Sequence, residues 1–212
     1  DLHIDTYKPA DMPMAYGANN HGSIVQIKDQ WYIFYHRHTN GSWYSRQGCA
    51  EPISIAEDGS IEQVEITSCG LNGGPLAGQG EYPAYLACHL FTDEPSMYVG
   101  GDAFPKVMQD GKDGDEEIGY VGNVQNSATI GFKYFDMKNV KKIRVTMRGY
   151  ISGNIEVRLT WDGDVLASLP IEFTNVWETY ESEIEIPDGI HSLYFTFRGD
   201  GNGALKSFEL LV

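Results

Sequence analysis

Basic residues are scarce in this sequence. Fifteen Lys and Arg stand against 30 Asp and Glu among 212 residues, which gives a formal net charge of -15 at pH 7. An acidic surface repels the phosphates of nucleic acids and of anionic membranes. The composition therefore argues against nucleic acid or a membrane as a partner.

Cysteines and long apolar runs are also scarce. Cys49, Cys69 and Cys88 form an odd set without a metal-type spacing, so we expect buried free thiols rather than disulfides or a zinc site. The sequence holds no apolar run that would span a membrane and no secretory signal segment. It begins without Met, as a processed, truncated or excised piece would.

Aromatic residues, in contrast, make up 12% of the chain, and Tyr is the commonest of them. Tyr and Trp offer a flat apolar face with a polar edge, which suits sugar rings. Proteins rich in β-structure also use many aromatic residues for packing. Composition alone leaves both explanations open.

The C-terminal third of the chain alternates between apolar and polar residues with a period of two. This pattern is typical of half-buried strands joined by tight turns, without a helical period. It predicts an antiparallel sandwich of the jelly-roll kind. The predicted strands are 143–147, 155–161, 180–186, 193–197 and 208–212.

Shorter strand-like runs precede this region, and residues 1–20 are expected to form a loop. The runs predict a small meander about the size of one propeller blade. A single blade cannot bury both of its faces, so either it packs on the following domain or neighbouring blades lie outside this chain. The predicted short strands are 24–27, 30–36, 43–46, 53–55 and 64–66.

Five glycines between residues 70 and 80 predict a linker or a tightly turned crossover. The expected organisation is therefore a terminal blade over 1–69, a linker over 70–80 and a sandwich over 81–212. The predicted fold class is all-β, a partial β-propeller blade followed by a β-sandwich (jelly roll).

Three motifs in the first part of the chain resemble the last blade of glycoside hydrolase family 43. They are Asn19-Asn20-His21-Gly22-Ser23, the run from Trp31 to His38, and Ser45-Arg46-Gln47 with Glu51-Pro52. This family has a five-bladed propeller and cleaves arabinose- and xylose-containing polysaccharides. The resemblance implies that His21 lies at the propeller axis, where it helps through water to hold a calcium ion. It also implies that Arg46 reaches into the sugar subsite, in keeping with guanidinium donors and hydroxyl acceptors.

Two histidines on the second short strand, His36 and His38, are spaced to face one side of it. Without the resemblance we would interpret them as edge or core histidines.

The same resemblance indicates which catalytic residues are missing. The family uses one carboxylate as general base, another as general acid and a third that tunes the acid. These residues belong to earlier blades, so no catalytic residue is assigned here. Glu51 lies in a predicted strand, and the acidic cluster over 113–117 is interpreted as a solvated turn, with a cation-binding loop as the alternative.

From about Tyr82 onward the sequence resembles a family 6 carbohydrate-binding module, a β-sandwich often attached behind such enzymes. In the family an aromatic pair grips a sugar between its rings. Tyr120 and Trp177 match this pair, with Tyr180 as a buried second aromatic, although either could instead cover the core. Trp177 lies in the polar segment 174–179, which we interpret as a link between strands. The substrate-binding residues implied are Tyr120, Trp177, Asn202 and Asn175.

One departure from the family pattern concerns a cation. Where the family has Asn followed two residues later by a calcium-ligating Asp, this chain has Ala204-Leu205-Lys206. Lys206 would place an ammonium group at a ligand position. We therefore expect no calcium at that site and predict that the lysine charge takes its place.

The function expected from these resemblances is the binding of a xylan- or arabinoxylan-like plant cell-wall polysaccharide by the C-terminal part of a glycoside hydrolase. One alternative is part of an active β-xylosidase or α-L-arabinofuranosidase whose catalytic blades lie outside this chain. Another is a sandwich with only a bracing role. The expected partners are the polysaccharide and either missing blades, a companion chain or a second copy. The expected location is secreted or on the cell surface.

Overall fold

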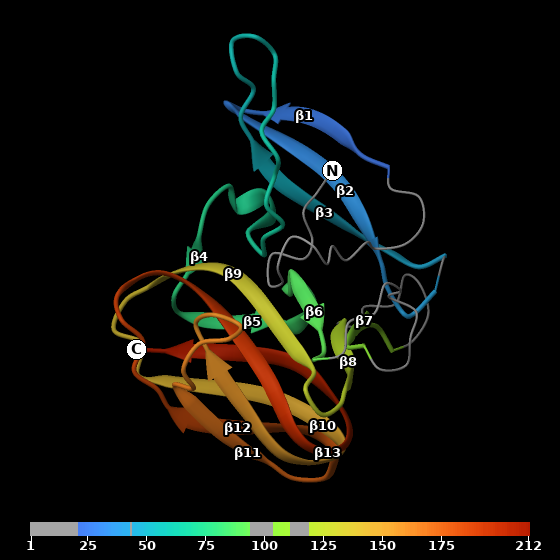
Figure 1. Ribbon diagram of the computed structural model, residues 1–212, viewed down its shortest axis with the longest axis vertical. Coiled ribbons are helices and arrows are strands. Elements are labelled where there is room, and N and C mark those ends of the chain that lie inside the picture. Colours follow the sequence, from blue (N-terminus) through green and yellow to red (C-terminus); the bar gives the residue numbers. More distant parts are fainter. Residues whose placement is uncertain (1–20, 43, 94–103, 111–118) are drawn as a thin grey trace.

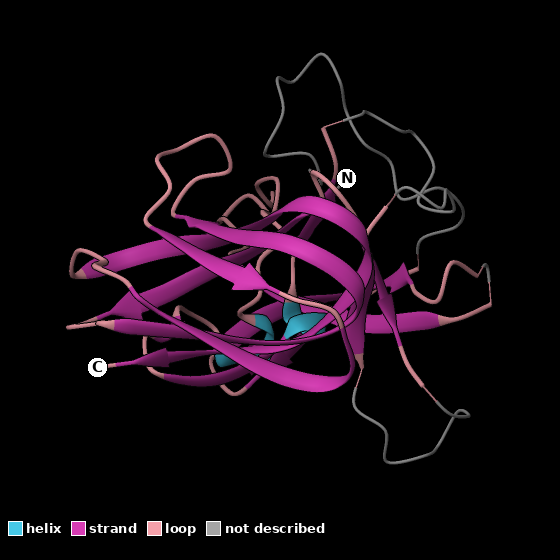
Figure 2. Ribbon diagram, turned by 90° about the horizontal axis from the view of Figure 1, so that it is seen from below, coloured by secondary structure: helices cyan, strands magenta, loops and turns pink. Residues whose placement is uncertain are grey.

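The computed structural model describes residues 21–42, 44–93, 104–110 and 119–212. Within them the chain consists of strands and two short 3-10 helices, η1 (Gly70–Asn72) and η2 (Ala84–Leu86) (Figure 1). The strands form a small three-stranded sheet and a larger curled sheet that makes a two-layered sandwich (Figure 2). The prediction of an all-β chain with a partial blade before a sandwich is confirmed. The loop expected over 1–20 and the acidic cluster over 113–117 lie outside the described residues.

The three-stranded sheet, called the blade below, is an antiparallel meander. It comprises β1 (Ser23–Ile27), β2 (Gln30–His38) and β3 (Arg46–Ile53), paired in that order. The first two strands confirm the predicted runs. The strand predicted over 43–46 is represented only by Arg46, the first residue of β3, and Trp43 lies outside the described residues.

Of the last two strands predicted for the blade, 53–55 is present in part and 64–66 is wrong. Beyond β3 an isolated antiparallel bridge joins Ile55 to Ile61, and residues 64–66 form no strand, with a single bridge residue at Glu65. The chain there runs toward the sandwich instead, where the Glu65 carboxylate meets Lys133 Nζ at 2.7 Å. Glu65 therefore pairs with the sandwich rather than with a strand of the blade.

The sandwich encloses one large apolar core. Phe132, Phe195 and Phe208 are fully buried in it, with the ring centroids of Phe132 and Phe208 4.7 Å apart. Its strands are β4 (Leu76–Ala77), β5 (Gly80–Pro83), β6 (His89–Phe91), β7 (Lys106–Met108), β8 (Tyr120–Val124), β9 (Thr129–Met137), β10 (Lys142–Arg158), β11 (Ala167–Ile171), β12 (Thr174–Glu183) and β13 (Gly189–Leu211).

Two long strands connect the layers, where the alternation predicted shorter, separate ones. β10 pairs with β13 along its whole length, with β12 along its first half and with β11 along its second half. Glycines face each other across this pair, as Gly149 does with Gly203. A Cβ on Gly149 would lie 2.5 Å from the Gly203 Cα, so only glycine permits this approach. The strands therefore bend without leaving the ladder.

Both tryptophans of the sandwich lie elsewhere than predicted. The run expected to reach Trp161 ends as a strand at Arg158, and Trp161 lies in a turn, 42% exposed. Trp177 lies within β12 rather than in a link. β12 pairs with β10 and is largely exposed, so residues 174–179 lack the apolar alternation by which strands are recognised. The strand predicted over 180–186 is the end of β12, which stops at Glu183.

The blade packs on the sandwich. The Arg37 guanidinium donates hydrogen bonds to the backbone carbonyls of Ala87 and of Tyr85, the latter at 2.7 Å, and Gln47 Nε2 donates to the Tyr85 carbonyl at 3.0 Å. An apolar cluster lies between the two parts and consists of Tyr35, Ile66 and Cys88, with Cys49 against it. One face of the blade is therefore covered by the sandwich, which is the first of the two arrangements expected for a single blade.

The glycine-rich stretch over 70–80 also contacts the sandwich. β4 pairs in parallel with β9, and β5 pairs with β13. Cys69 and Cys88 are buried free thiols, as predicted, and Cys49 is a half-buried one. Within the described ranges, no helix is long and apolar enough to cross a membrane.

Candidate functional site

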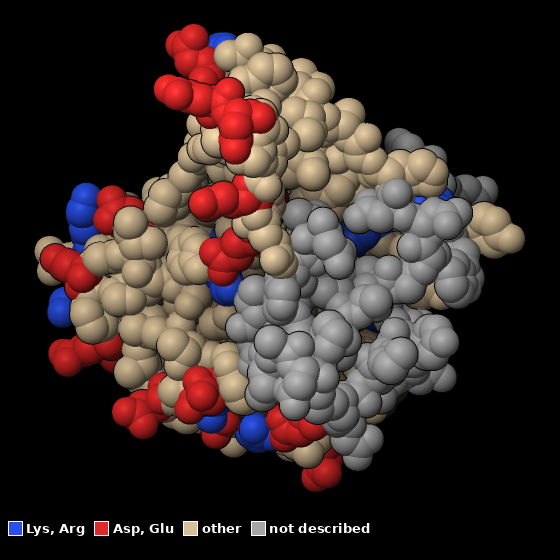
Figure 3. All heavy atoms as spheres, turned by 45° about the horizontal axis from the view of Figure 1, so that its top comes forward, with Lys and Arg blue, Asp and Glu red and all other residues tan. Residues whose placement is uncertain are grey.

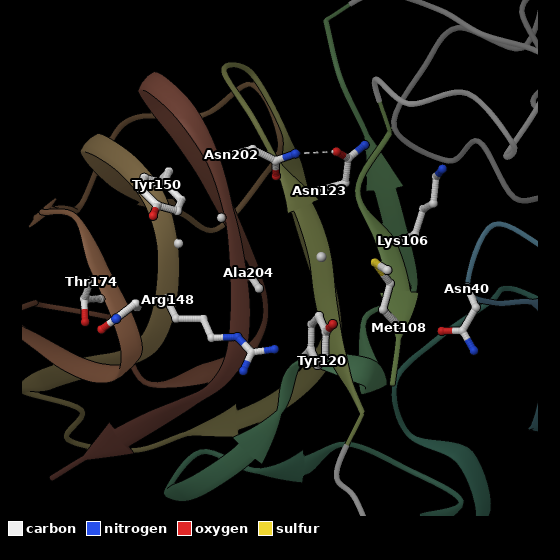
Figure 4. Close-up of a pocket in the computed structure, with 14 residues that line it drawn as sticks. Asn40, Lys106, Met108, Tyr120, Asn123, Arg148, Tyr150, Thr174, Asn202 and Ala204 are labelled. Atoms are coloured by element: carbon white, nitrogen blue, oxygen red, sulfur yellow. Dashed lines mark hydrogen bonds between the residues drawn. The ribbon is translucent and has the colours of Figure 1, made fainter. Parts of the chain in front are cut away.

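A pocket of about 520 Å³ lies where the two long strands bend, next to β7, β8 and the turn between β2 and β3 (Figure 4). Segments from across the whole sequence contribute to it. The lining residues are Asn40, Lys106, Met108, Tyr120, Gly122, Asn123, Arg148, Gly149, Tyr150, Thr174, Asn175, Asn202, Gly203 and Ala204.

The glycines of the bend set the direction of two lining side chains. Gly149 and Gly201 have φ of +136° and +93°, values that side-chain-bearing residues rarely adopt. Between them Tyr150 pairs with Asn202 across β10 and β13. Figure 4 shows both side chains at the margin of the pocket.

A hydrogen-bonded group of amides forms one wall. Asn202 Nδ2 donates to Asn123 Oδ1 at 2.9 Å, and Asn123 Nδ2 donates to the Phe104 carbonyl at 2.8 Å. Gln125 Nε2 donates to the same Asn123 oxygen at 2.7 Å. These bonds fix the orientation of the Asn123 amide. Side-chain amides carry both donors and acceptors, so this wall can pair with hydroxyl groups.

The predicted aromatic pair lies beside this wall. Tyr120 and Trp177 contact each other edge to face, with ring centroids 5.6 Å apart and 63° between the planes. A flat ring held between two aromatic rings needs about 7 to 8 Å between them, since each carbon contact takes about 3.5 to 4.0 Å. The described pair is therefore too close to hold a sugar between its rings.

The open face of Trp177 is covered by Arg148, whose guanidinium carbon lies 4.2 Å from the ring centroid. Arg148 extends toward Tyr120 (Figure 4) and forms a 2.5 Å salt bridge with Asp110, which also accepts a 2.8 Å hydrogen bond from the Tyr120 hydroxyl. Partial burial opposes ionisation of Asp110, but the bonds from Arg148 and Tyr120 outweigh it and lower its pKa. This charged group holds the two rings together.

Cations gather around this pair. Besides Arg148, the Lys206 ammonium lies 5.9 Å from the Trp177 ring centroid, at a break in the register of β13. Lys106 lines the pocket itself. Elsewhere, acidic side chains are spread over the blade and the sandwich on the face seen in Figure 3. Three cationic side chains thus lie in or beside the pocket, and one of them, Arg148, is paired with Asp110.

Four of the six predicted site residues come together here. Tyr120, Asn175 and Asn202 line the pocket, and Trp177 contacts Tyr120. Arg46 does not line it and is exposed at the start of β3.

His21 is exposed just before β1, also away from the pocket lining. Its ring stacks on His36, with centroids 5.7 Å apart, and His36 meets His38 at 5.9 Å. His36 and His38 therefore share one side of β2, as their spacing predicts. The part of the chain that the structure describes holds no group of three or more His, Cys, Asp or Glu arranged to bind a metal ion.

Sequence reasoning missed Arg148 and Tyr150. Arg148 looked like the solvent-facing member of an alternating strand, and nothing local indicated that it would cover Trp177, 29 positions later. Tyr150 follows a glycine in the strand, and such a glycine often marks a bulge that redirects its neighbours. That signal could have identified Tyr150.

Comparison with known proteins bears on this site directly. Residues 107–210, which include most of the pocket, match the model of carbohydrate binding module (family 6). This segment is similar to carbohydrate-binding module family 6. The structure also resembles that of a family 6 carbohydrate-binding module from Clostridium cellulolyticum in complex with xylose, with a TM-score of 0.52 and 18% identity, over 65% of this chain and 100% of that one.

The whole chain, blade included, has longer relatives. It is 59% identical to a xylosidase/arabinosidase of Thermoclostridium stercorarium over 99% of this chain and 46% of that protein. The structure resembles a family 43 arabinoxylan arabinofuranohydrolase from Bacillus subtilis, with a TM-score of 0.59 and 21% identity, over 92% of this chain and 41% of that one. The resemblance to both families is thereby confirmed. The chain spans less than half the length of the curated relatives that it matches.

Proposed function

We propose that this chain binds xylan- or arabinoxylan-like polysaccharide of plant cell walls, as the C-terminal part of a secreted or cell-surface glycoside hydrolase. The observation that carries the proposal is the pocket of the family 6 module, lined by side-chain amides and tyrosine rings. The relative that is 59% identical is named a xylosidase/arabinosidase, which supports this class of polysaccharide.

Binding in the pocket would rest mainly on hydrogen bonds. The amides of Asn175 and Asn202 are exposed at its margin, and each can donate to one sugar hydroxyl and accept from another. Tyr120 supplies an apolar wall. Trp177 contributes by holding Tyr120 and Arg148 in place, because stacking of a sugar on the indole would require Arg148 to leave its face.

Calorimetric titration with xylohexaose and arabinoxylan tests the proposal. The wild type should release heat on binding, and Asn202→Ala should lower the affinity roughly 3- to 10-fold, the effect of one hydrogen bond of about 1 kcal/mol. Trp177→Ala should also weaken binding, because Tyr120 and Arg148 lose their support. Trp161→Ala is the matched control, since Trp161 is exposed in a turn outside the pocket lining. A wild type that binds neither ligand would refute the proposal.

An enzymatic role of a longer protein is a second candidate, favoured by the open side of the blade. Every residue of β1 is exposed, and Ile24, Val25 and Ile27 are 44%, 43% and 39% exposed. An apolar edge strand of this kind is where a neighbouring blade, a companion chain or a second copy would pack. We propose that the missing blades of a family 43 propeller occupy it and supply the catalytic carboxylates.

In that longer protein Arg46 would reach the sugar subsite and His21 would help hold a calcium ion. An imidazole is not an oxygen ligand, so His21 fits calcium only through water. Joining the chain to the preceding blades and measuring release of arabinose or xylose from aryl glycosides tests this role. Release by the longer protein that depends on Arg46 would support it. An inactive longer protein that is correctly folded would refute the enzymatic role and leave polysaccharide binding untouched.

A further inference from the structure

Two exposed aromatic rings pack against each other next to the pocket. Tyr150 is 78% exposed and Phe173 is 54% exposed, and their ring centroids are 4.6 Å apart with 31° between the planes. Single apolar side chains on a surface are common, but adjoining large ones usually mark a binding surface, because each gains free energy when it leaves water. We call this pair the Tyr150–Phe173 platform.

The platform is continuous with the pocket. Tyr150 is itself one of the lining residues, and Phe173 immediately precedes Thr174 and Asn175, which also line it. Figure 4 shows Tyr150 and Thr174 on the same side of the pocket, from β10 and from the start of β12. A linear molecule that leaves the pocket on this side therefore meets the platform.

We propose that the Tyr150–Phe173 platform stacks on a further sugar residue of the same polysaccharide chain, beyond the residue held in the pocket. The inference rests on the proposed function and extends it from a pocket for one end of a ligand to a surface for a longer chain. At 4.6 Å between centroids and 31° between planes the two rings pack against each other, so each supports the other and keeps its outer face and edges for the C–H groups of a sugar ring.

The comparison with Trp177 supports the choice of this platform. The face of Trp177 is covered by the Arg148 guanidinium at 4.2 Å, and its neighbour Tyr120 is buried. Tyr150 and Phe173, in contrast, are open to solvent. The ring faces most available for stacking beside the pocket are therefore those of the platform. The adjoining Asn175 and Asn202 amides suit the hydroxyl groups of a neutral sugar.

Titration of a Tyr150→Ala, Phe173→Ala double variant with xylobiose and with xylohexaose tests the inference. Both side chains are exposed, so the variant should keep the thermal unfolding temperature of the wild type. Its affinity for xylohexaose should fall about 5- to 100-fold, the range for loss of a stacked ring, while its affinity for xylobiose should fall much less, because only the edge of the pocket at Tyr150 is changed. Tyr150→Phe is the matched control: it keeps the ring and should bind xylohexaose normally.

The outcomes separate this inference from the proposed function. Binding of xylohexaose that is equal in wild type and double variant overturns the platform and leaves the pocket as the binding site. An equal loss for both ligands also overturns it, because the rings would then belong to the pocket itself. A wild type that binds neither ligand overturns the proposed function and, with it, the inference.

Discussion

The buried carboxyl group of Glu51 should make the stability of this protein fall as pH rises. Glu51 is 1% exposed on β3, and its carboxyl accepts hydrogen bonds from the Thr67 backbone N–H at 2.8 Å, the Thr67 hydroxyl at 2.6 Å and the Tyr35 hydroxyl at 3.1 Å. Burial raises the pKa of Glu51 from 4.5 to about 7, and the negative charge of Glu65 adds to the rise. The hydrogen bonds act in the opposite direction without offsetting burial.

The direction of the change in stability with pH depends on whether the folded or the unfolded state keeps the Glu51 proton to higher pH. Below about pH 4.5 the carboxyl is protonated in both states and the raised pKa costs nothing. As pH rises from about 4.5 to about 7, the unfolded chain releases its proton first, so the free energy of unfolding decreases. The rise of the Glu51 pKa to about 7 corresponds to a loss of about 3 kcal/mol when complete.

Glu51→Gln removes this titration and keeps a side chain of the same shape. Relative to the wild type, the variant should gain about 3 kcal/mol between about pH 4.5 and about pH 8, which is about 6 to 12 °C in Tm for a chain of this size. Thermal unfolding of both proteins across this range measures the difference. Glu62→Gln, at an exposed position, is the control. A Tm difference between Glu51→Gln and wild type that stays constant with pH would refute the reasoning.

Three further predictions concern the sandwich. Gly149→Ala should lower stability by about 1 to 3 kcal/mol, since its Cβ would lie 2.5 Å from the Gly203 Cα, and it should weaken xylohexaose binding in titration; unchanged Tm and affinity would contradict this. Phe132→Ala should cost about 3 to 5 kcal/mol because Phe132 is fully buried, and denaturant unfolding would contradict this if the midpoint stays in place. Added calcium should leave the Tm of the wild type unchanged because Lys206 stands at the ligand position of the family, whereas a calcium-dependent rise in Tm would speak against that assignment.

The sequence predicted secondary structure correctly where the alternation of apolar and polar residues alone determines it. The alternation of Ile143, Val145 and Met147 predicted a half-buried strand, and all three side chains are fully buried in β10. The sequence did not predict strands that form only because a neighbouring strand pairs with them. The first part of β12, residues 174–179, is a strand because β10 lies beside it, although its own residues carry no strand pattern. β10 and β13 likewise remain continuous because glycines such as Gly149 and Gly203 face each other, and the sequence does not show that pairing.

The candidate site shows the same division. The resemblance to known families identified Tyr120, Trp177 and Asn202, and the structure brings these residues together. It did not indicate that Arg148 would cover the indole of Trp177, because that contact depends on the register between β10 and β12.

The sequence by itself determined the all-β class, the acidic surface and the kinship with carbohydrate-active proteins, because these follow from composition, period and motifs along the chain. Only the tertiary structure decided that the blade packs on the sandwich, that Glu51 is buried between hydroxyl groups and that the Tyr150–Phe173 platform adjoins the pocket. The physical reason is that each of these depends on distances between residues far apart in the chain, and strand pairing and core packing set those distances.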